Sequence, residues 1–267
     1  MHPIISLVGP TASGKTSLAI ALALRYNAEI LSADSMQFYR GMEIGTAAPT
    51  QREQNLVPHH FVSCLNPDES MAAGRYQALG RDCLATLEEQ GKRAVVVGGS
   101  GLYINALIDG LFEGPARDEQ IRVRLQHEAE SLGNEALLVR LQSIDPDYAA
   151  RLGSANDLVR IVRALEVYEI TGTPYSELHR LHQKEGEGLK AQFFALDWDR
   201  DVLYERINSR VDAMISAGWV EEVRALIKVG YGAQLERLKA LGFREIAAHL
   251  RDEQGLEEAI EAAKMHH

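Results

Sequence analysis

Residues 9–16 have the composition and spacing of a phosphate-binding loop, Gly9-Pro10-Thr11-Ala12-Ser13-Gly14-Lys15-Thr16. The glycines let the backbone fold around an anion, and the N–H groups at the start of the next helix attract negative charge. We expect Lys15 to reach the terminal phosphates and the Thr16 hydroxyl to ligate Mg²⁺. The alternative is a glycine-rich turn with no ligand. The sequence therefore predicts a polyphosphate site, and the loop alone does not determine which polyphosphate or what reaction.

Asp34 is the best candidate for a second chemical group. Many phosphoryl-transfer enzymes with such a loop hold Mg²⁺ with an acid at the end of another strand. Here the apolar run 94–97 ends in Gly98-Gly99-Ser100-Gly101 instead, whereas Asp34 follows the run 29–32. Asp34 is suited to be a metal partner, a general base that orients a nucleophile, or the cap of a following helix.

Two pairs of arginines have helical spacing. Arg160 and Arg163 share one helix face, and so do Arg206 and Arg210. Phosphate or RNA binding is one interpretation. The other interpretation is ion pairing with acids on neighbouring turns, namely Asp157, Glu166, Glu205 and Asp212. The spacing leaves both interpretations open.

The histidines and cysteines do not have metal-ligand spacing. His59 and His60 are adjacent, so in an extended segment they point to opposite sides, and we expect solvated loop histidines. Cys64 and Cys83 are expected to be reduced thiols. Neither pair is predicted to carry chemistry.

The elements that must position these residues alternate between strand and helix in the first hundred residues. We predict strands over 4–8, 28–32 and 93–97, and helices over 15–25, about 70–90 and 102–111. This alternation is typical of a parallel sheet covered by helices, in which ligands gather at the carboxyl ends of the strands. The phosphate loop, Asp34 and the Gly98 turn all lie at such ends.

The strand pattern stops at residue 113 and returns at 192–196. Helical periodicity fills the interval and also follows the last strand, over 118–131, 134–143, 146–152, 157–171, 202–217, 219–229, 242–251 and 256–267. We predict an α/β fold with a P-loop parallel-sheet core flanked by helices. Its domains are a catalytic core, residues 1–112 and 191–267, and an all-helical insertion, residues 113–190.

Composition adds limits. The 267 residues carry a net charge of −10, which leans against a broad nucleic-acid-binding surface. No apolar stretch approaches the roughly 20 residues of a membrane span, and no signal peptide precedes the first strand. We expect a cytoplasmic protein without a membrane partner.

Taken together, the motifs resemble those of bacterial tRNA dimethylallyltransferases, also called tRNA isopentenyltransferases. The resemblance spans residues 4 to about 250. It rests on the phosphate loop and on later blocks in the family's order: 34–37 with Tyr39, Gly45-Thr46-Ala47, Pro58-His59-His60, 98–103, Asn156-Asp157, Arg160, 163–166, Arg206-Ile207, Arg210 and Met214.

The resemblance implies transfer of a dimethylallyl group from dimethylallyl diphosphate to N6 of the adenine 3′ of the anticodon (tRNA position 37), with release of diphosphate. The phosphate loop with Lys15, Thr16 and Mg²⁺ would then bind the leaving diphosphate. Asp34 resembles the catalytic carboxylate that accepts a hydrogen bond from the adenine amino group. Either Arg206 or Arg210 fits the helix arginine that contacts diphosphate.

The resemblance also implies a partner, the tRNA anticodon stem-loop, and we expect the enzyme to be a monomer. The helical insertion would grip the stem-loop, with the target base flipped into the cleft. The positions implied to touch tRNA are Asp34, Ser35, Met36, Gln37, Ser100, Arg122, Val159, Arg160, Ile161, Val162, Arg163, Lys239, Gly242, Phe243 and Arg244.

The sequence departs from the family pattern at Ala48, where lysine is frequent, and at Ser100, where threonine is usual. The family also leads us to expect a basic segment after His267. Three alternatives stay open: a small-molecule P-loop kinase using ATP, an adenylate isopentenyltransferase acting on AMP or ADP, and an RNA-binding regulator without turnover.

Overall fold

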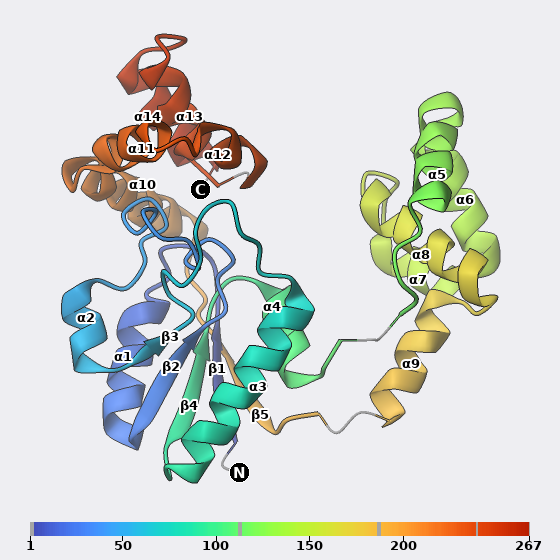
Figure 1. Cartoon of the computed structure of the whole chain (residues 1–267), viewed down its shortest axis with the longest axis horizontal. Coiled ribbons are helices and arrows are strands. Elements are labelled where there is room, and N and C mark those ends of the chain that lie inside the picture. The colour runs from blue at the N-terminus through green and yellow to red at the C-terminus, as the bar shows by residue number, and fades with distance from the viewer. Residues whose placement is uncertain (1–2, 112–113, 186–187, 239, 267) are drawn as a thin grey trace. The chain divides into compact units, whose positions relative to one another are not determined.

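The computed structural model describes residues 3–111, 114–185, 188–238 and 240–266 (Figure 1). The chain forms two compact units. The first comprises Met1–Ile108 and Leu189–His267, and the second comprises Asp109–Gly188. The sequence had placed the corresponding boundaries at residues 113 and 190.

One parallel sheet forms the centre of the first unit, with strand order β3-β2-β4-β1-β5. The strands are β1 (Ile4–Val8), β2 (Ala28–Ser32), β3 (His59–His60), β4 (Arg93–Val97) and β5 (Ala191–Ala195). The predicted α/β class is therefore confirmed. The expectation of solvated loop histidines is wrong, because His59 and His60 are half-buried and pair with the edge of β2. Two residues are too few to produce a strand periodicity.

Helices cover both faces of this sheet because successive strand side chains point to opposite sides. Val95 of β4 packs in one cluster with Ile20 of α1, and Val96 packs in another with Leu107 of α4. Both valines are fully buried, as expected for a central parallel strand. The covering helices are α1 (Lys15–Tyr26), α2 (Gln51–Leu56), α3 (Ala73–Glu89) and α4 (Gly101–Ile108).

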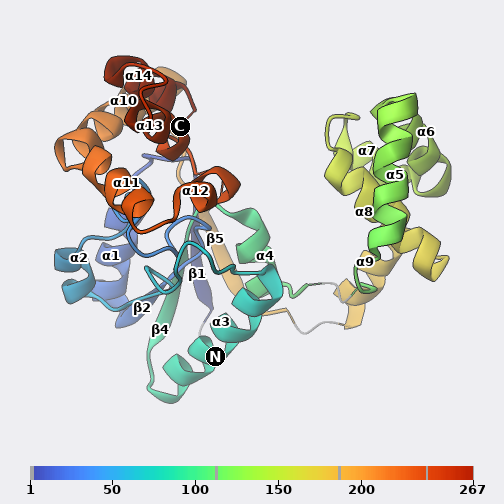
Figure 2. The same cartoon turned by 45° about the horizontal axis from the view of Figure 1, so that its top comes forward.

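A second group of helices lies at the end of the sheet where the strands finish (Figures 1 and 2). They are α10 (Arg200–Ser216), α11 (Trp219–Lys228), α12 (Gly232–Leu238), α13 (Phe243–Leu250) and α14 (Leu256–His266). Trp219 and Phe243 are fully buried and anchor this group. Within the described residues, no helix is both long and apolar enough to span a bilayer.

The second unit is helical in its described residues and has its own core. Leu125, Leu137 and Ile161 are fully buried there. Its helices are α5 (Glu119–Leu132), α6 (Asn134–Ile144), α7 (Pro146–Leu152), α8 (Leu158–Thr171) and α9 (Tyr175–Glu185). Aspartates cap α5, α7 and α8. An N-cap carboxylate accepts backbone N–H groups that have no partner within the helix, so these caps fix the helix starts.

Candidate active site

The phosphate loop joins β1 to α1 and is stabilised by its own lysine. Lys15 Nζ donates to Gly9 O at 2.9 Å and to Pro10 O at 2.6 Å. Gly14 has φ +93°, a left-handed conformation that glycine adopts without strain. Helix α1 starts at Lys15, so its first N–H groups have no helical acceptor and are open to an anion.

Asp34 is brought to this loop by contacts between neighbouring strand ends. Ala33 N donates to Val97 O at 2.7 Å, and Ser100 N donates to Ala33 O at 3.2 Å. A Cβ at Gly98 would collide with the Ala33 backbone, so only glycine permits this approach. Asp34 Oδ1 accepts from Met36 N at 3.0 Å. Asp34 therefore stabilises a turn rather than a helix start, and its other oxygen makes no such turn contact.

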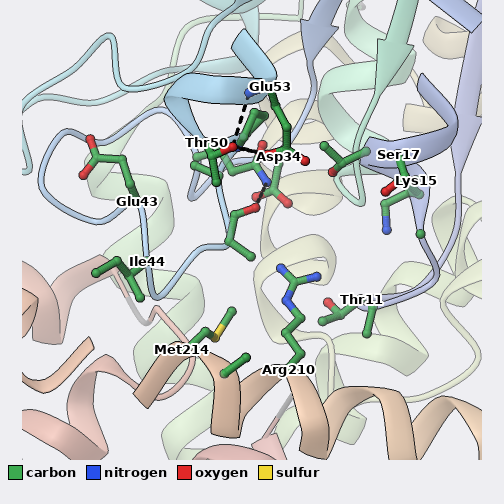
Figure 3. A pocket seen from close by; sticks show the side chains of 18 of the residues that line it. Thr11, Lys15, Ser17, Asp34, Glu43, Ile44, Thr50, Glu53, Arg210 and Met214 are labelled. Carbon is green, nitrogen blue, oxygen red and sulfur yellow. Dashed lines mark hydrogen bonds between the residues drawn. The ribbon is translucent and has the colours of Figure 1, made fainter. Parts of the chain in front are cut away.

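The phosphate loop, Asp34 and α10 line one cleft of about 1250 Å³. Figure 3 shows the Arg210 side chain extending from α10 toward Asp34, with Lys15 and Thr11 on the side of the phosphate loop. Ile44 and Met214 supply an apolar part of the wall. The lining also includes Glu43, Glu53 and Glu205. Where Lys15 and Arg210 face Asp34 beside the apolar wall, the cleft can hold an anionic group joined to an apolar group.

Burial alters the two cations that face Asp34. Burial lowers the pKa of Lys15, the nearby Asp34 carboxylate opposes that shift, and Arg210 adds to it. Burial likewise lowers the pKa of the Arg210 guanidinium, again against the influence of Asp34. At the phosphate loop, these two desolvated cations face one carboxylate, Asp34, so a further anion bound between Lys15 and Arg210 would be stabilised there.

The two α10 arginines, which spacing could not separate, have different environments. Arg206 Nε donates to Ala12 O at 2.8 Å, and its guanidinium lies 4.3 Å from the centre of the Trp198 ring. Arg210 Nη2 makes a long hydrogen bond of 3.4 Å to Thr46 O, and its buried Nε has no partner among the described residues. Arg210 thus retains donors for a ligand, whereas Arg206 is engaged by the protein.

Glu222 is a site residue that the sequence analysis missed. Its carboxylate accepts from Ile44 N at 2.8 Å and from Gly45 N at 2.9 Å. These bonds fix the segment that lines the cleft and presents Thr46 O to Arg210. The Gly45-Thr46-Ala47 motif gave the position of the segment, but no local pattern linked it to α11.

We expect Glu222→Gln to change how stability depends on pH. Burial raises the pKa of Glu222 to about 7, and Glu43 adds to the rise although two backbone hydrogen bonds oppose it. Between the ordinary carboxyl value of 4.5 and about 7, the folded chain therefore holds more protons than the unfolded chain. Wild-type stability should fall through this interval as pH rises, and the glutamine variant lacks that contribution.

Thermal unfolding of wild type and Glu222→Gln from about pH 5 to about pH 8 tests this expectation. The Tm of wild type minus the Tm of Glu222→Gln should decrease as pH rises. Glu221→Gln, an exposed neighbour on the same helix, is the matched control. A wild-type minus variant difference that stays constant with pH would contradict the assignment.

The structure places the implied tRNA contacts in three groups. Near Asp34, Ser35 N donates to Ser100 Oγ at 3.2 Å, and Gln37 Nε2 contacts Thr46 O at 3.5 Å. Met36 is half-buried beside them. At α13, Gly242 and Phe243 are buried and Arg244 is exposed, whereas Lys239 lies outside the described residues.

The third group is in the helical unit and contains both exposed and buried residues. Val159 and Arg160 are exposed, and Arg160 pairs with Asp157 at 3.3 Å, whereas Ile161 and Val162 are buried. Arg122 and Arg163 are directed inward, to Glu166. In this unit the arginines form the ion pairs that the spacing had left open.

We expect Glu166→Ala to destabilise the helical unit. The fully buried carboxylate accepts from Arg122 Nε and Nη2, both at 2.9 Å, from Arg163 Nη1 at 2.7 Å and from Asp118 N at 2.8 Å. Removing one partner of a buried pair costs about 3–5 kcal/mol. Loss of the helical circular dichroism of this unit at lower urea concentration is the readout, with the exposed Glu130→Ala as control.

Acid should have the same effect as the mutation. Burial alone would raise the pKa of Glu166, but the hydrogen bonds from Arg122 and Arg163 lower it to about 2. Since this pKa lies below the ordinary 4.5, the ionised Glu166 carboxylate stabilises the folded state fully above pH 4.5. That stabilisation is lost as pH falls toward 2. Equal unfolding of wild type and Glu166→Ala at neutral pH would refute both expectations.

Fold and site together define an α/β protein of the P-loop type with a cleft at the carboxyl end of its parallel sheet. The model of the IPP transferase family matches residues 37–267. The chain is 46% identical over 258 residues to a tRNA dimethylallyltransferase of Syntrophobacter fumaroxidans, covering 97% of this chain and 75% of that protein. It is 45% identical over 261 residues to a tRNA dimethylallyltransferase of Geobacter metallireducens, covering 98% of this chain and 84% of that protein. The chain belongs to the IPP transferase family.

Solved structures show the same fold. The tRNA isopentenylpyrophosphate transferase of Bacillus halodurans is 37% identical with a TM-score of 0.67, covering 99% of this chain and 82% of that one. A eukaryotic dimethylallyltransferase, described as acting on tRNA, is 27% identical with a TM-score of 0.78. The match covers 99% of this chain and 67% of that one. The resemblance seen in the motifs is therefore confirmed over nearly the whole chain.

Proposed function

We propose that this chain transfers a dimethylallyl group from dimethylallyl diphosphate to N6 of the adenine 3′ of the anticodon, position 37 of tRNA, and releases diphosphate. The observation that carries the proposal is the meeting of Lys15, Arg210 and Asp34 in one cleft beside an apolar wall. The two cations fit the diphosphate, Ile44 and Met214 fit the apolar group, and Asp34 fits the acceptor amine.

The reaction follows from these positions. The N6 lone pair attacks the allylic carbon, the bond from that carbon to the diphosphate oxygen breaks, and its electron pair leaves on the diphosphate. The N6 proton goes to Asp34. Lys15, Arg210 and the N–H groups of the phosphate loop stabilise the negative charge that develops on the leaving group. Since no phosphoryl group moves, the end of β4 needs no acid to activate a nucleophile for phosphoryl transfer.

Mg²⁺ fits the donor set of this cleft. The Thr16 hydroxyl and Asp34 also line a small cavity of about 30 Å³ at the base of the phosphate loop, and both present the oxygen ligands that Mg²⁺ prefers. Thr16 would hold the ion together with diphosphate oxygens. When bound, the ion would neutralise part of the leaving-group charge.

The proposed acceptor is the tRNA anticodon stem-loop. The names of the relatives support it, and Arg160, Val159 and Arg244 offer exposed side chains at positions that the family resemblance implies. Contacts of this kind recognise mainly the shape and phosphates of an RNA. A cytoplasmic monomer remains our prediction.

A labelled-donor experiment tests the proposal. The chain is incubated with radiolabelled dimethylallyl diphosphate, Mg²⁺ and either unmodified tRNA or AMP, and a parallel reaction receives labelled ATP. We expect label in tRNA only. Label in AMP would select an adenylate isopentenyltransferase, and consumption of ATP with the isoprenoid donor ignored would select a kinase.

A further inference from the structure

Trp198 contacts the phosphate loop but is not among the residues that line the cleft. It follows β5 in the chain, and its indole Nε1 donates to Ser13 O at 2.9 Å across a sequence separation of 185 residues. We propose that Trp198 is a positioning residue that orients the Gly14 N–H of the phosphate loop toward the diphosphate, and that Arg206 supports the adjacent turn of the same loop. The inference deepens the proposed function and rests on it.

The orientation follows from the geometry of the peptide unit. In a planar trans peptide, the C=O group and the next N–H group point in opposite directions. Holding Ser13 O toward Trp198 therefore turns Gly14 N–H away from it, to the side where the first N–H groups of α1 are open. Arg206 holds the preceding peptide group, because its Nε donates to Ala12 O. Ser13 N–H accordingly points back across the loop to Pro10 O, at 3.4 Å.

The two side chains support each other. The Arg206 guanidinium stacks on the Trp198 ring at 4.3 Å from its centre. Trp198 is 40% exposed, so its contact with Ser13 is not a by-product of core burial. The loop also needs external support, because Ala12 has φ +61°, which is uncommon for a residue with a side chain. Two consecutive carbonyl groups held by Trp198 and Arg206 therefore stabilise this conformation of the loop.

This arrangement gives Arg206 a role distinct from that of Arg210. Arg210 faces the cleft with free donors, whereas the Nε of Arg206 and the face of its guanidinium are occupied by the loop and by Trp198. Trp198 therefore acts on diphosphate through the backbone of the loop, whereas Arg206 supports the loop and also lines the cleft.

The test measures binding of inorganic diphosphate with Mg²⁺ to the full chain by calorimetry. Trp198→Phe keeps an aromatic ring under Arg206 and removes only the N–H donor. We expect its Kd for diphosphate to rise about threefold to tenfold, as for the loss of one hydrogen bond. Trp198→Leu removes the ring as well and should weaken binding further. In turnover assays, KM for dimethylallyl diphosphate should rise while KM for tRNA stays unchanged.

The matched control is Tyr204→Phe. Tyr204 is an exposed aromatic residue of α10 whose hydroxyl accepts from Arg200 Nε at 3.0 Å while Arg200 lies over its ring, but neither contacts the phosphate loop. The control removes one hydrogen bond from a similar pair, and its Kd should equal that of wild type. All variants should remain folded at the assay temperature, which thermal unfolding checks.

A spectroscopic readout accompanies the binding measurement. The chain has two tryptophans, and Trp219 is fully buried away from solvent. Diphosphate should change the tryptophan emission of wild type and of Tyr204→Phe, and leave that of Trp198→Phe unchanged. Equal diphosphate affinity of Trp198→Phe and Tyr204→Phe would overturn the inference alone. A wild-type chain that does not bind diphosphate would overturn the proposed function and the inference with it.

Discussion

Replacing Asp34 by asparagine is expected to lower kcat about 10²- to 10⁴-fold, the range that a positioned base contributes. Asparagine has the same shape and still accepts the hydrogen bond from Met36 N, so the turn at the end of β2 should be preserved. The side chain can no longer take the proton that N6 must lose. Single-turnover kinetics with labelled dimethylallyl diphosphate measures the loss.

Binding and chemistry should separate in this variant. The Kd for tRNA, measured by filter binding, should stay near the wild-type value, because Asp34 contributes a single contact to a large RNA surface. Glu205→Gln is the control, since Glu205 is an exposed carboxylate that also lines the cleft. Comparable turnover in the Asp34 and Glu205 variants would remove Asp34 from the mechanism.

Arg210→Ala is expected to lower kcat about 10²- to 10³-fold, as does the loss of one donor aimed at developing charge. The effect should be large because Arg210 is desolvated, lies beside Lys15 in the cleft and has an Nε with no partner in the described part of the chain. Arg210→Lys should recover only part of the loss, since an ammonium group offers one point charge in place of a planar pair of donors. Steady-state kinetics with varied dimethylallyl diphosphate is the measurement.

Arg200→Ala controls for the removal of positive charge from α10. Arg200 is exposed and contacts only Tyr204 in the structure described here. Its replacement should leave kcat unchanged at moderate ionic strength, where exposed charges are largely screened. If both arginine variants had the same small effect, diphosphate binding by Arg210 would be excluded.

Several features of the fold were predictable because they depend on neighbours in sequence. The run 94–97 is apolar on both faces, and the structure confirms it as the buried central strand β4. The aspartates before α5, α7 and α8 cap those helices through contacts of two or three residues. Elements with weak local patterns were missed, namely β3, α2, α9 and α12.

The candidate site was likewise predicted only in part from the sequence. The spacing of residues 9–16 predicted a loop that binds phosphate, and the structure places this loop at the carboxyl end of β1 beside Asp34. By contrast, the sequence could not separate Arg206 from Arg210, because both occupy one face of α10. It also implied that Arg122 and Arg163 contact RNA, whereas in the structure both guanidinium groups hydrogen-bond to Glu166.

By itself, then, the sequence determined the class of fold, the phosphate loop and the identity of the candidate carboxylate, because periodicity and motif spacing are local properties of the chain. Only the tertiary structure decided which cation retains free donors, and which side chains hold the loop from outside. Those contacts join residues as far apart as Ala12 and Arg206, and Ile44 and Glu222. Their formation depends on how α10 and α11 pack at the end of the sheet, which no local pattern encodes.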